Sequence, residues 1–76
     1  MTTDQLTTEF ESFQRELKSF ILRMTASVQD AEDIVQETYL KAHAKFDTFR
    51  GESTLKTWVF TIASNLARDL LRAKKR

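Results

Sequence analysis

The sequence has no cysteine, no proline and a single glycine, Gly51, among its 76 residues. The absence of cysteine excludes disulfides, thiolate zinc sites and cysteine nucleophiles. The shortage of glycine and proline argues against an all-β domain, because such a domain needs several tight turns and builds them from Gly, Pro, Asn and Asp. We therefore expect an all-α fold, in one domain over residues 1–76, since domains have about 50 to 250 residues.

Long hydrophobic runs are also missing. Fully apolar stretches are no longer than three residues, as in Phe20-Ile21-Leu22, so the sequence predicts no membrane-spanning segment. The first residues, MTTDQ, lack the basic and apolar regions of a signal peptide. The sequence therefore predicts a cytoplasmic protein that does not associate with a membrane.

The charges are unevenly distributed, although the formal net charge is only +1. Residues 1–47 hold nine acidic and five basic side chains, whereas residues 48–76 hold two acidic and seven basic ones. One acidic and one basic region suit two different partners. A basic tail that serves only solubility is the alternative explanation.

Three amphipathic stretches predict a compact three-helix bundle. Apolar residues at three- and four-residue steps place the helices at about residues 5–26, 31–45 and 54–73. Asp30 is expected to cap the second helix and Ser53 the third, because short polar side chains accept hydrogen bonds from free backbone N–H groups.

Catalytic side chains are sparse. His43 is the only histidine, and neither Ser53 nor Ser64 has a nearby histidine to act as a base. Asp33 and Glu37 lie four residues apart and could share a metal ion, but acids near a helix start usually complement the helix dipole. We therefore expect no enzyme activity, no metal and no cofactor.

The segment between the second and third helices, residues 46–53, breaks the helical pattern and contains Gly51, which we expect at positive φ. Its aromatic residues, Phe46 and Phe49, could stack on an unpaired nucleobase. Alternatively, the two rings fill the end of the bundle. The basic residues that follow could bind phosphates: Lys56, Arg68, Arg72, Lys74, Lys75 and Arg76.

The strings in the second half of the chain resemble region 2 of bacterial RNA polymerase sigma factors, in particular the extracytoplasmic-function (ECF) subgroup. They are DAEDIVQETYLKA at 30–42, FDTFRGES at 46–53, KTW at 56–58 and IASNLARDLLR at 62–72. The similarity is continuous over residues 30–76, and the order and spacing of the strings make it specific.

The resemblance implies that the second helix binds core RNA polymerase through the clamp helices of the beta-prime subunit. The positions that match this polar face are Asp33, Gln36 and Glu37. Nearby on the same helix, Tyr39, Leu40 and His43 could extend it. Three- and four-residue steps connect Asp33, Gln36, Leu40 and His43 and place them on one side of the helix. That side lies away from Ile34, Val35 and Thr38. An exposed leucine among polar groups suits an interface anchor.

The resemblance also implies that the loop and the third helix capture a base flipped out of the non-template strand of the promoter minus-ten element. Phe49, Ile62 and Asn65 match the positions that wall the base pocket, and Asn65 would read the base edge, because its amide both donates and accepts hydrogen bonds. The alternative for Ile62 and Trp58 is a place in the core. Trp58 is followed by Val59, so the paired tryptophan wedge of housekeeping sigma factors is not available. The candidate DNA-binding residues are Phe49, Arg50, Ser53, Lys56, Trp58, Ile62, Asn65, Arg68 and Arg72.

Further implications concern the rest of the protein. ECF sigma factors carry a second helical domain, region 4, for the minus-thirty-five element; residues 72–76 resemble the linker to it, and its helix-turn-helix is absent from this sequence. An anti-sigma factor is a further expected partner. The alternatives from the residues alone are a helix-turn-helix that binds duplex DNA and a protein-interaction bundle.

Overall fold

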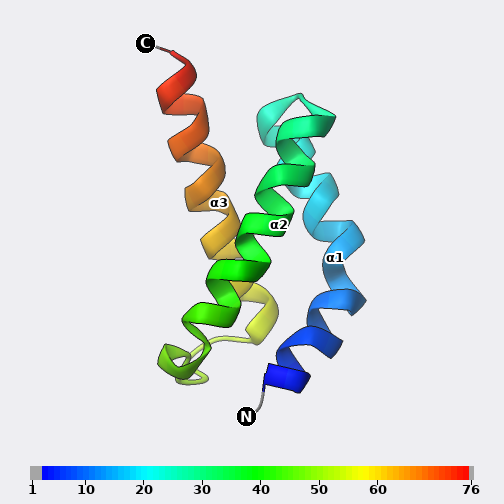
Figure 1. Ribbon diagram of the computed structural model, residues 1–76, viewed down its shortest axis with the longest axis vertical. Coiled ribbons are helices and arrows are strands. Elements are labelled where there is room, and N and C mark those ends of the chain that lie inside the picture. Colours follow the sequence, from blue (N-terminus) through cyan, green and yellow to red (C-terminus); the bar gives the residue numbers. More distant parts are fainter. Residues whose placement is uncertain (1–2, 76) are drawn as a thin grey trace.

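The computed structural model describes residues 3–75 and consists of three long helices and one helical turn. The order along the chain is α1 (Thr3–Thr25), α2 (Val28–Ala44), the 3-10 turn η1 (Phe46–Thr48) and α3 (Leu55–Lys74). The helices run up, down and up, so α1 and α3 are parallel and α2 is antiparallel to both (Figure 1). The predicted all-α three-helix bundle is confirmed, and the helix ends differ from the prediction by up to three residues.

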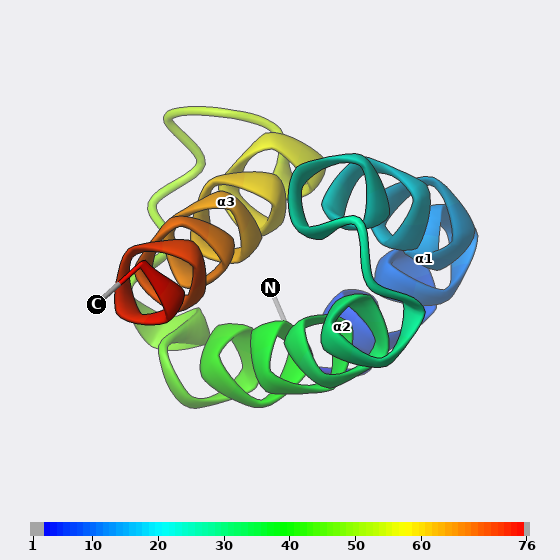
Figure 2. The same ribbon diagram turned by 90° about the horizontal axis from the view of Figure 1, so that it is seen from above.

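The three helices surround one apolar core, as the view along the bundle shows (Figure 2). The apolar stripe predicted on α2 is buried, and so is that on α1 except for Phe20 and Met24, which are partly exposed. On α3, Ala63 and Ala67 are buried together with Leu55 and Val59, whereas Ile62 and Leu66 are only partly covered. The buried core residues are Leu6, Phe10, Phe13, Leu17, Ile21, Ala31, Ile34, Val35, Ala42, Phe46, Leu55, Val59, Ala63 and Ala67.

The connection between α1 and α2 is shorter than expected, and the predicted cap of α2 was wrong. Helix α2 begins at Val28, and the Ser27 hydroxyl accepts a hydrogen bond of 3.2 Å from the backbone N–H of Asp30. Ser27 has the extended backbone of an N-cap, which leaves Asp30 inside the first turn. Ala26 makes the turn with φ of 56°.

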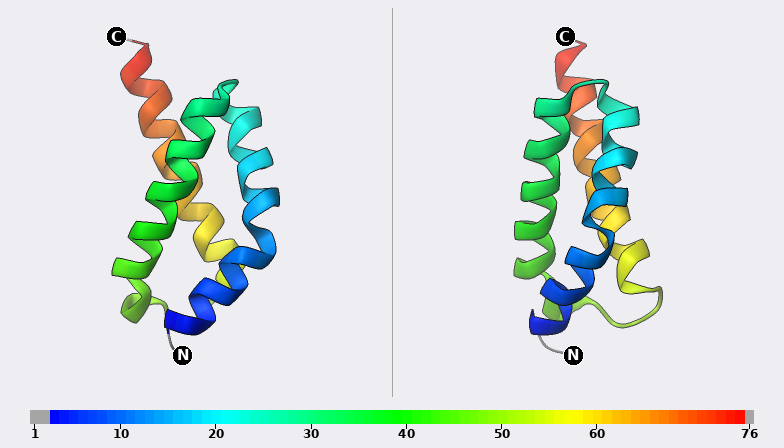
Figure 3. Two further views of the ribbon diagram at one scale, coloured as in Figure 1. Left: turned by 45° about the vertical axis from the view of Figure 1, so that its right-hand side comes forward. Right: turned by 90° about the vertical axis from the view of Figure 1, so that its right-hand side faces the viewer.

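The predicted cap of α3 was also wrong by one residue. The Thr54 hydroxyl, not that of Ser53, accepts a hydrogen bond of 3.1 Å from the backbone N–H of Thr57. The preceding loop contains Gly51 with φ of 76°, as the sequence predicted. The loop leaves the bundle at the end where α1 begins and swings outward on the α3 side (Figure 3).

Three ion pairs within residues 3–75 connect the three pairs of helices. Lys18 on α1 pairs with Glu32 on α2 at 3.5 Å, and Lys56 on α3 pairs with Glu16 on α1 at 2.6 Å. Lys74, at the end of α3, pairs with Asp30 in the first turn of α2. Among residues 3–75, no helix combines the length and the apolar character that crossing a membrane requires.

Candidate functional site

Helix α2 presents one continuous polar face, which we call the α2 surface. Its five residues are all exposed and lie opposite the buried side of the helix, over about a third of its circumference at 3.6 residues per turn. Leu40 is 66% exposed in the middle of this face. The predicted placement on one exposed side is therefore confirmed for Asp33, Gln36, Glu37, Leu40 and His43.

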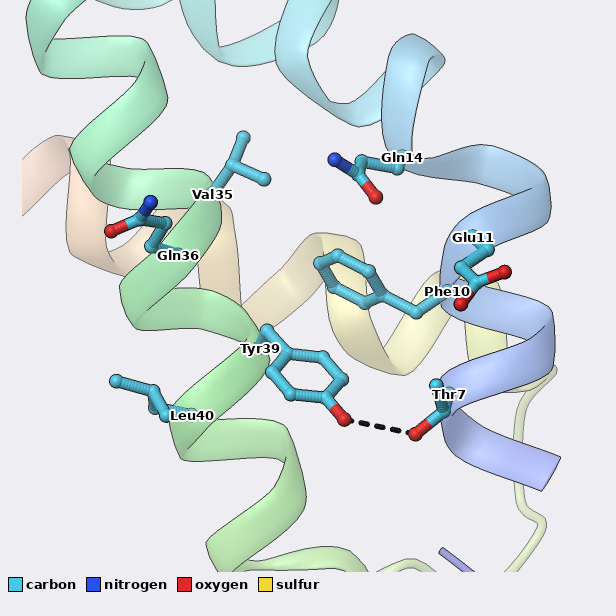
Figure 4. Close-up of a pocket in the computed structure, with 8 residues that line it drawn as sticks. All are labelled: Thr7, Phe10, Glu11, Gln14, Val35, Gln36, Tyr39 and Leu40. Carbon is cyan, nitrogen blue, oxygen red and sulfur yellow. Dashed lines mark hydrogen bonds between the residues drawn. The ribbon is translucent and has the colours of Figure 1, made fainter. Parts of the chain in front are cut away.

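A groove of about 380 Å³ borders the α2 surface, between α1 and α2. In Figure 4 the rings of Phe10 and Tyr39 lie next to each other and meet edge to face, with centroids 5.1 Å apart, and the Tyr39 hydroxyl is 2.8 Å from that of Thr7. Gln36 and Leu40 extend from α2 on the side away from Phe10 (Figure 4). Contacts with α1 therefore hold Tyr39 in place, whereas Leu40 is left at the surface.

The loop before α3 and the first turns of α3 enclose a second hollow of about 420 Å³, which we call the loop pocket. Phe49 and Trp58 stand side by side in its wall, with ring centroids 5.1 Å apart, and both are half-buried. Phe46 is only 7% exposed and fills the end of the bundle. Filling the end of the bundle is therefore confirmed for Phe46, whereas base stacking by Phe49 stays a prediction. The lining residues are Thr48, Phe49, Arg50, Glu52, Ser53 and Trp58.

Two predicted base-contacting residues lie outside this pocket, further along α3. Asn65 is seven residues after Trp58, which places both on the same side of the helix, two turns apart. Its side chain is exposed and makes no hydrogen bond within residues 3–75. Ile62 lies between them, half-buried and packed against the core. Trp58, Ile62 and Asn65 thus share one side of α3, and we call this side together with the loop pocket the α3 track.

The predicted phosphate contacts lie on two different sides of α3. Arg72 is exposed about two turns beyond Asn65 and pairs loosely with Asp69 at 3.8 Å. Arg68 donates a hydrogen bond of 3.2 Å to the Ser64 hydroxyl. Lys56 lies on the side that faces α1, so the structure separates it from Trp58 and Asn65. Arg76 lies outside the described residues.

The sequence analysis did not identify Phe60, which lies on the α1-facing side of α3. Its ring centroid is 5.9 Å from that of Phe13 and 5.4 Å from that of Phe20, and Lys56 Nζ is 5.7 Å from it. Phe60 starts a second run of three- and four-residue steps that includes Ala63 and Ala67. That run in the sequence could have identified Phe60 as a residue that packs between α3 and α1.

Comparison with known proteins shows the family of the chain. The family model for Sigma-70 region 2 matches residues 10–76. The ECF RNA polymerase sigma factor SigG of Mycobacterium tuberculosis is 44% identical over 66 residues, which is 87% of this chain and 18% of that protein. EcfG of Rhodopseudomonas palustris is 36% identical over 74 residues, 97% of this chain and 41% of that protein.

The sigma-E factor of Escherichia coli, also an ECF sigma factor, is 39% identical over 64 residues, 84% of this chain and 33% of that protein. The chain therefore belongs to the Sigma-70 region 2 family, within the ECF subgroup of sigma factors. It spans between 18% and 41% of the length of these three relatives.

Proposed function

We propose that the chain acts in transcription initiation as the ECF sigma domain that binds core RNA polymerase and single-stranded minus-ten DNA. It acts by binding, without catalysis of its own. The observation that carries this proposal is the presence of two separate exposed surfaces in a member of this family. One is the polar α2 surface with its two acidic residues, and the other is an aromatic track along the loop and α3.

The α2 surface is proposed to bind the clamp helices of the beta-prime subunit. Leu40 offers an apolar anchor, and Asp33 and Glu37 provide charges that suit basic side chains on the partner. Interfaces commonly combine an apolar centre with a polar rim, and the charges accelerate and orient the encounter. Gln36 and His43 complete the rim.

The loop pocket is proposed to receive a base flipped out of the non-template strand. Its volume lies within the range of small-ligand pockets, about 300–1,000 Å³, and the base would stack on Phe49 and Trp58. Arg50 and Ser53 supply polar groups at the rim. Flipping costs a few kcal/mol of lost stacking, which aromatic contacts of about 1–3 kcal/mol per base offset.

The remaining contacts follow the track along α3. Asn65 would hydrogen-bond the edge of an adjacent unpaired base, because its amide has no partner to give up within the described residues. Arg68 and Arg72 would hold phosphates and fix the register of the strand without reading its sequence. The weak Arg72–Asp69 pair, with both side chains about 70% exposed, leaves Arg72 free to do so.

The geometry does not favour a helix-turn-helix that binds duplex DNA. Such a motif joins its helices with a turn of three or four residues, whereas α2 and α3 are separated by η1 and an extended loop that ends at Thr54. An anti-sigma factor remains a further proposed partner, which rests on the ECF subgroup alone.

Two binding assays with two variants test the proposal. Fluorescence anisotropy measures binding of labelled non-template and template minus-ten oligonucleotides, and a pull-down with core polymerase measures the other surface. Asn65→Ala should abolish strand-selective binding and leave polymerase binding intact, whereas Leu40→Lys should do the reverse. Equal loss of both activities in either variant, or equal affinity of the wild type for the two strands, would contradict the proposal.

A further inference from the structure

A third concave surface lies between α1 and α3, with a volume of about 520 Å³, and we call it the α1–α3 groove. Phe20 and Phe60 provide its apolar part, with ring centroids 5.4 Å apart and both rings half-buried. Hydroxyl groups from three positions of α3 line it as well: Thr57, Thr61 and Ser64. The groove therefore presents both aromatic and hydroxyl side chains at the surface, whereas the core is apolar and closed.

Two cations flank the groove. Lys56 and Arg68 both line it and are twelve residues apart on α3, which corresponds to about 18 Å along the helix axis. Lys75, seven residues after Arg68, is the C-cap of α3 and adds a further positive charge beyond this end of the helix. The Ser64 hydroxyl accepts a hydrogen bond from Arg68, which leaves its own hydrogen for a ligand oxygen.

One acid opposes these cations. Glu16 of α1 lines the same groove, and its carboxylate is 2.6 Å from Lys56 Nζ. The side chains of Lys56 and Glu16 are 47% and 59% exposed, so water screens their attraction and the pair contributes little stability. An incoming phosphate can therefore replace the carboxylate as the partner of Lys56 at little cost.

We propose that the α1–α3 groove binds a second stretch of single-stranded DNA, outside the loop pocket, through phosphate contacts to Lys56 and Arg68. Aromatic side chains beside basic residues are the combination that binds single strands without reading their sequence. Arg68 lies next to Asn65 around the circumference of α3, so a strand on the proposed track reaches the groove by crossing Arg68. The inference rests on the proposed single-strand binding and extends it to a second face of α3.

The salt dependence of binding to labelled oligothymidine, which carries phosphates but no minus-ten sequence, tests the groove. Each phosphate contact to a single strand contributes about 0.7 to the slope of log K against log salt, which corresponds to about fivefold in affinity near 0.1 M salt. Arg68→Gln and Lys56→Gln should each cause losses of this size, and Arg68→Lys should restore most of the affinity. Lys41→Gln, an exposed cation on α2, is the matched control.

Removing the acid of the Lys56–Glu16 ion pair should have the opposite effect on the affinity for oligothymidine. Glu16→Gln should strengthen oligothymidine binding by about twofold, because Lys56 no longer has a carboxylate partner. All five side-chain changes are at exposed positions, so thermal unfolding should remain close to that of the wild type.

The outcomes separate this inference from the proposed base capture. If Arg68→Gln and Lys56→Gln reduce the salt slope no more than Lys41→Gln does, or if oligothymidine does not bind, the groove is overturned. Strand-selective binding of the minus-ten oligonucleotide would in that case still support the loop pocket. If both variants reduce the salt slope but the wild type binds the two minus-ten strands with equal affinity, the groove proposal stands and the base-capture proposal is overturned.

Discussion

Replacing Asn65 with alanine should weaken DNA binding and stabilise the fold at the same time. Asn65 is exposed in the middle of α3 and makes no side-chain hydrogen bond within residues 3–75, so the variant loses no native contact. Alanine is the better helix former by about 0.5 kcal/mol. For a domain of this size, that gain raises the unfolding temperature by about 2–4 °C.

The loss of binding should be much larger than the gain in stability. An amide that hydrogen-bonds a base edge contributes about 1–3 kcal/mol of discrimination, which corresponds to about five- to 150-fold in affinity. Anisotropy with the non-template oligonucleotide measures this loss, and circular dichroism melting measures stability. Gln14→Ala on α1 is the control, because it also removes an exposed amide from a helix but lies away from the track.

Opposite signs in the two measurements are what distinguish a binding residue from a structural one. If Asn65→Ala lowers the unfolding temperature by several degrees, the side chain has a structural role that the geometry does not show. If the variant melts higher but binds the non-template strand as well as Gln14→Ala does, Asn65 does not read a base, and the α3 track is wrong.

Three further predictions concern the connections that set the helix ends. Ala26→Gly should raise the free energy of unfolding by about 1 kcal/mol, because the positive φ of 56° strains an L-residue; Ala44→Gly, in a right-handed helix, should lower it when melted alongside. Ser27→Ala should cost about 1 kcal/mol by removing the cap of α2, and an unchanged denaturation midpoint would show that the cap does not matter. Gly51→Ala should cost about 1–2 kcal/mol from backbone strain alone, since a Cβ at Gly51, with φ of 76°, would meet no atom within 4 Å; denaturant titration should therefore show Gly51→Asn to be milder, and equal losses would contradict the strain.

Much of the fold could be predicted from the sequence because the helices are regular. The α1 residues Leu6, Phe10, Phe13 and Leu17 follow the helical repeat, and the structure buries all of them. The first residue of each helix was harder to predict, because serine, threonine and aspartate are all good N-caps and several of them lie close together in the sequence. Asp30 and Ser53 were plausible caps, and the choice of Ser27 and Thr54 depends on how the chain turns between helices.

The candidate sites could be predicted residue by residue but not arranged in space. The α2 surface followed from helical steps, since all its members lie on one helix. The loop pocket depends on the path of an irregular segment, so the pairing of Phe49 with Trp58 appeared only in the structure. Lys56 and Trp58 are neighbours in sequence, yet about 200° of helical rotation places them on different sides of α3.

Intrinsic fluorescence tests the central claim most directly, because Trp58 is the only tryptophan and lies in the wall of the loop pocket. The account predicts that the non-template minus-ten strand changes the Trp58 emission in a saturable way, with the same midpoint as anisotropy, and that the template strand leaves it unchanged. Anisotropy that reports binding of the non-template strand without any change in Trp58 emission would contradict base capture by this pocket.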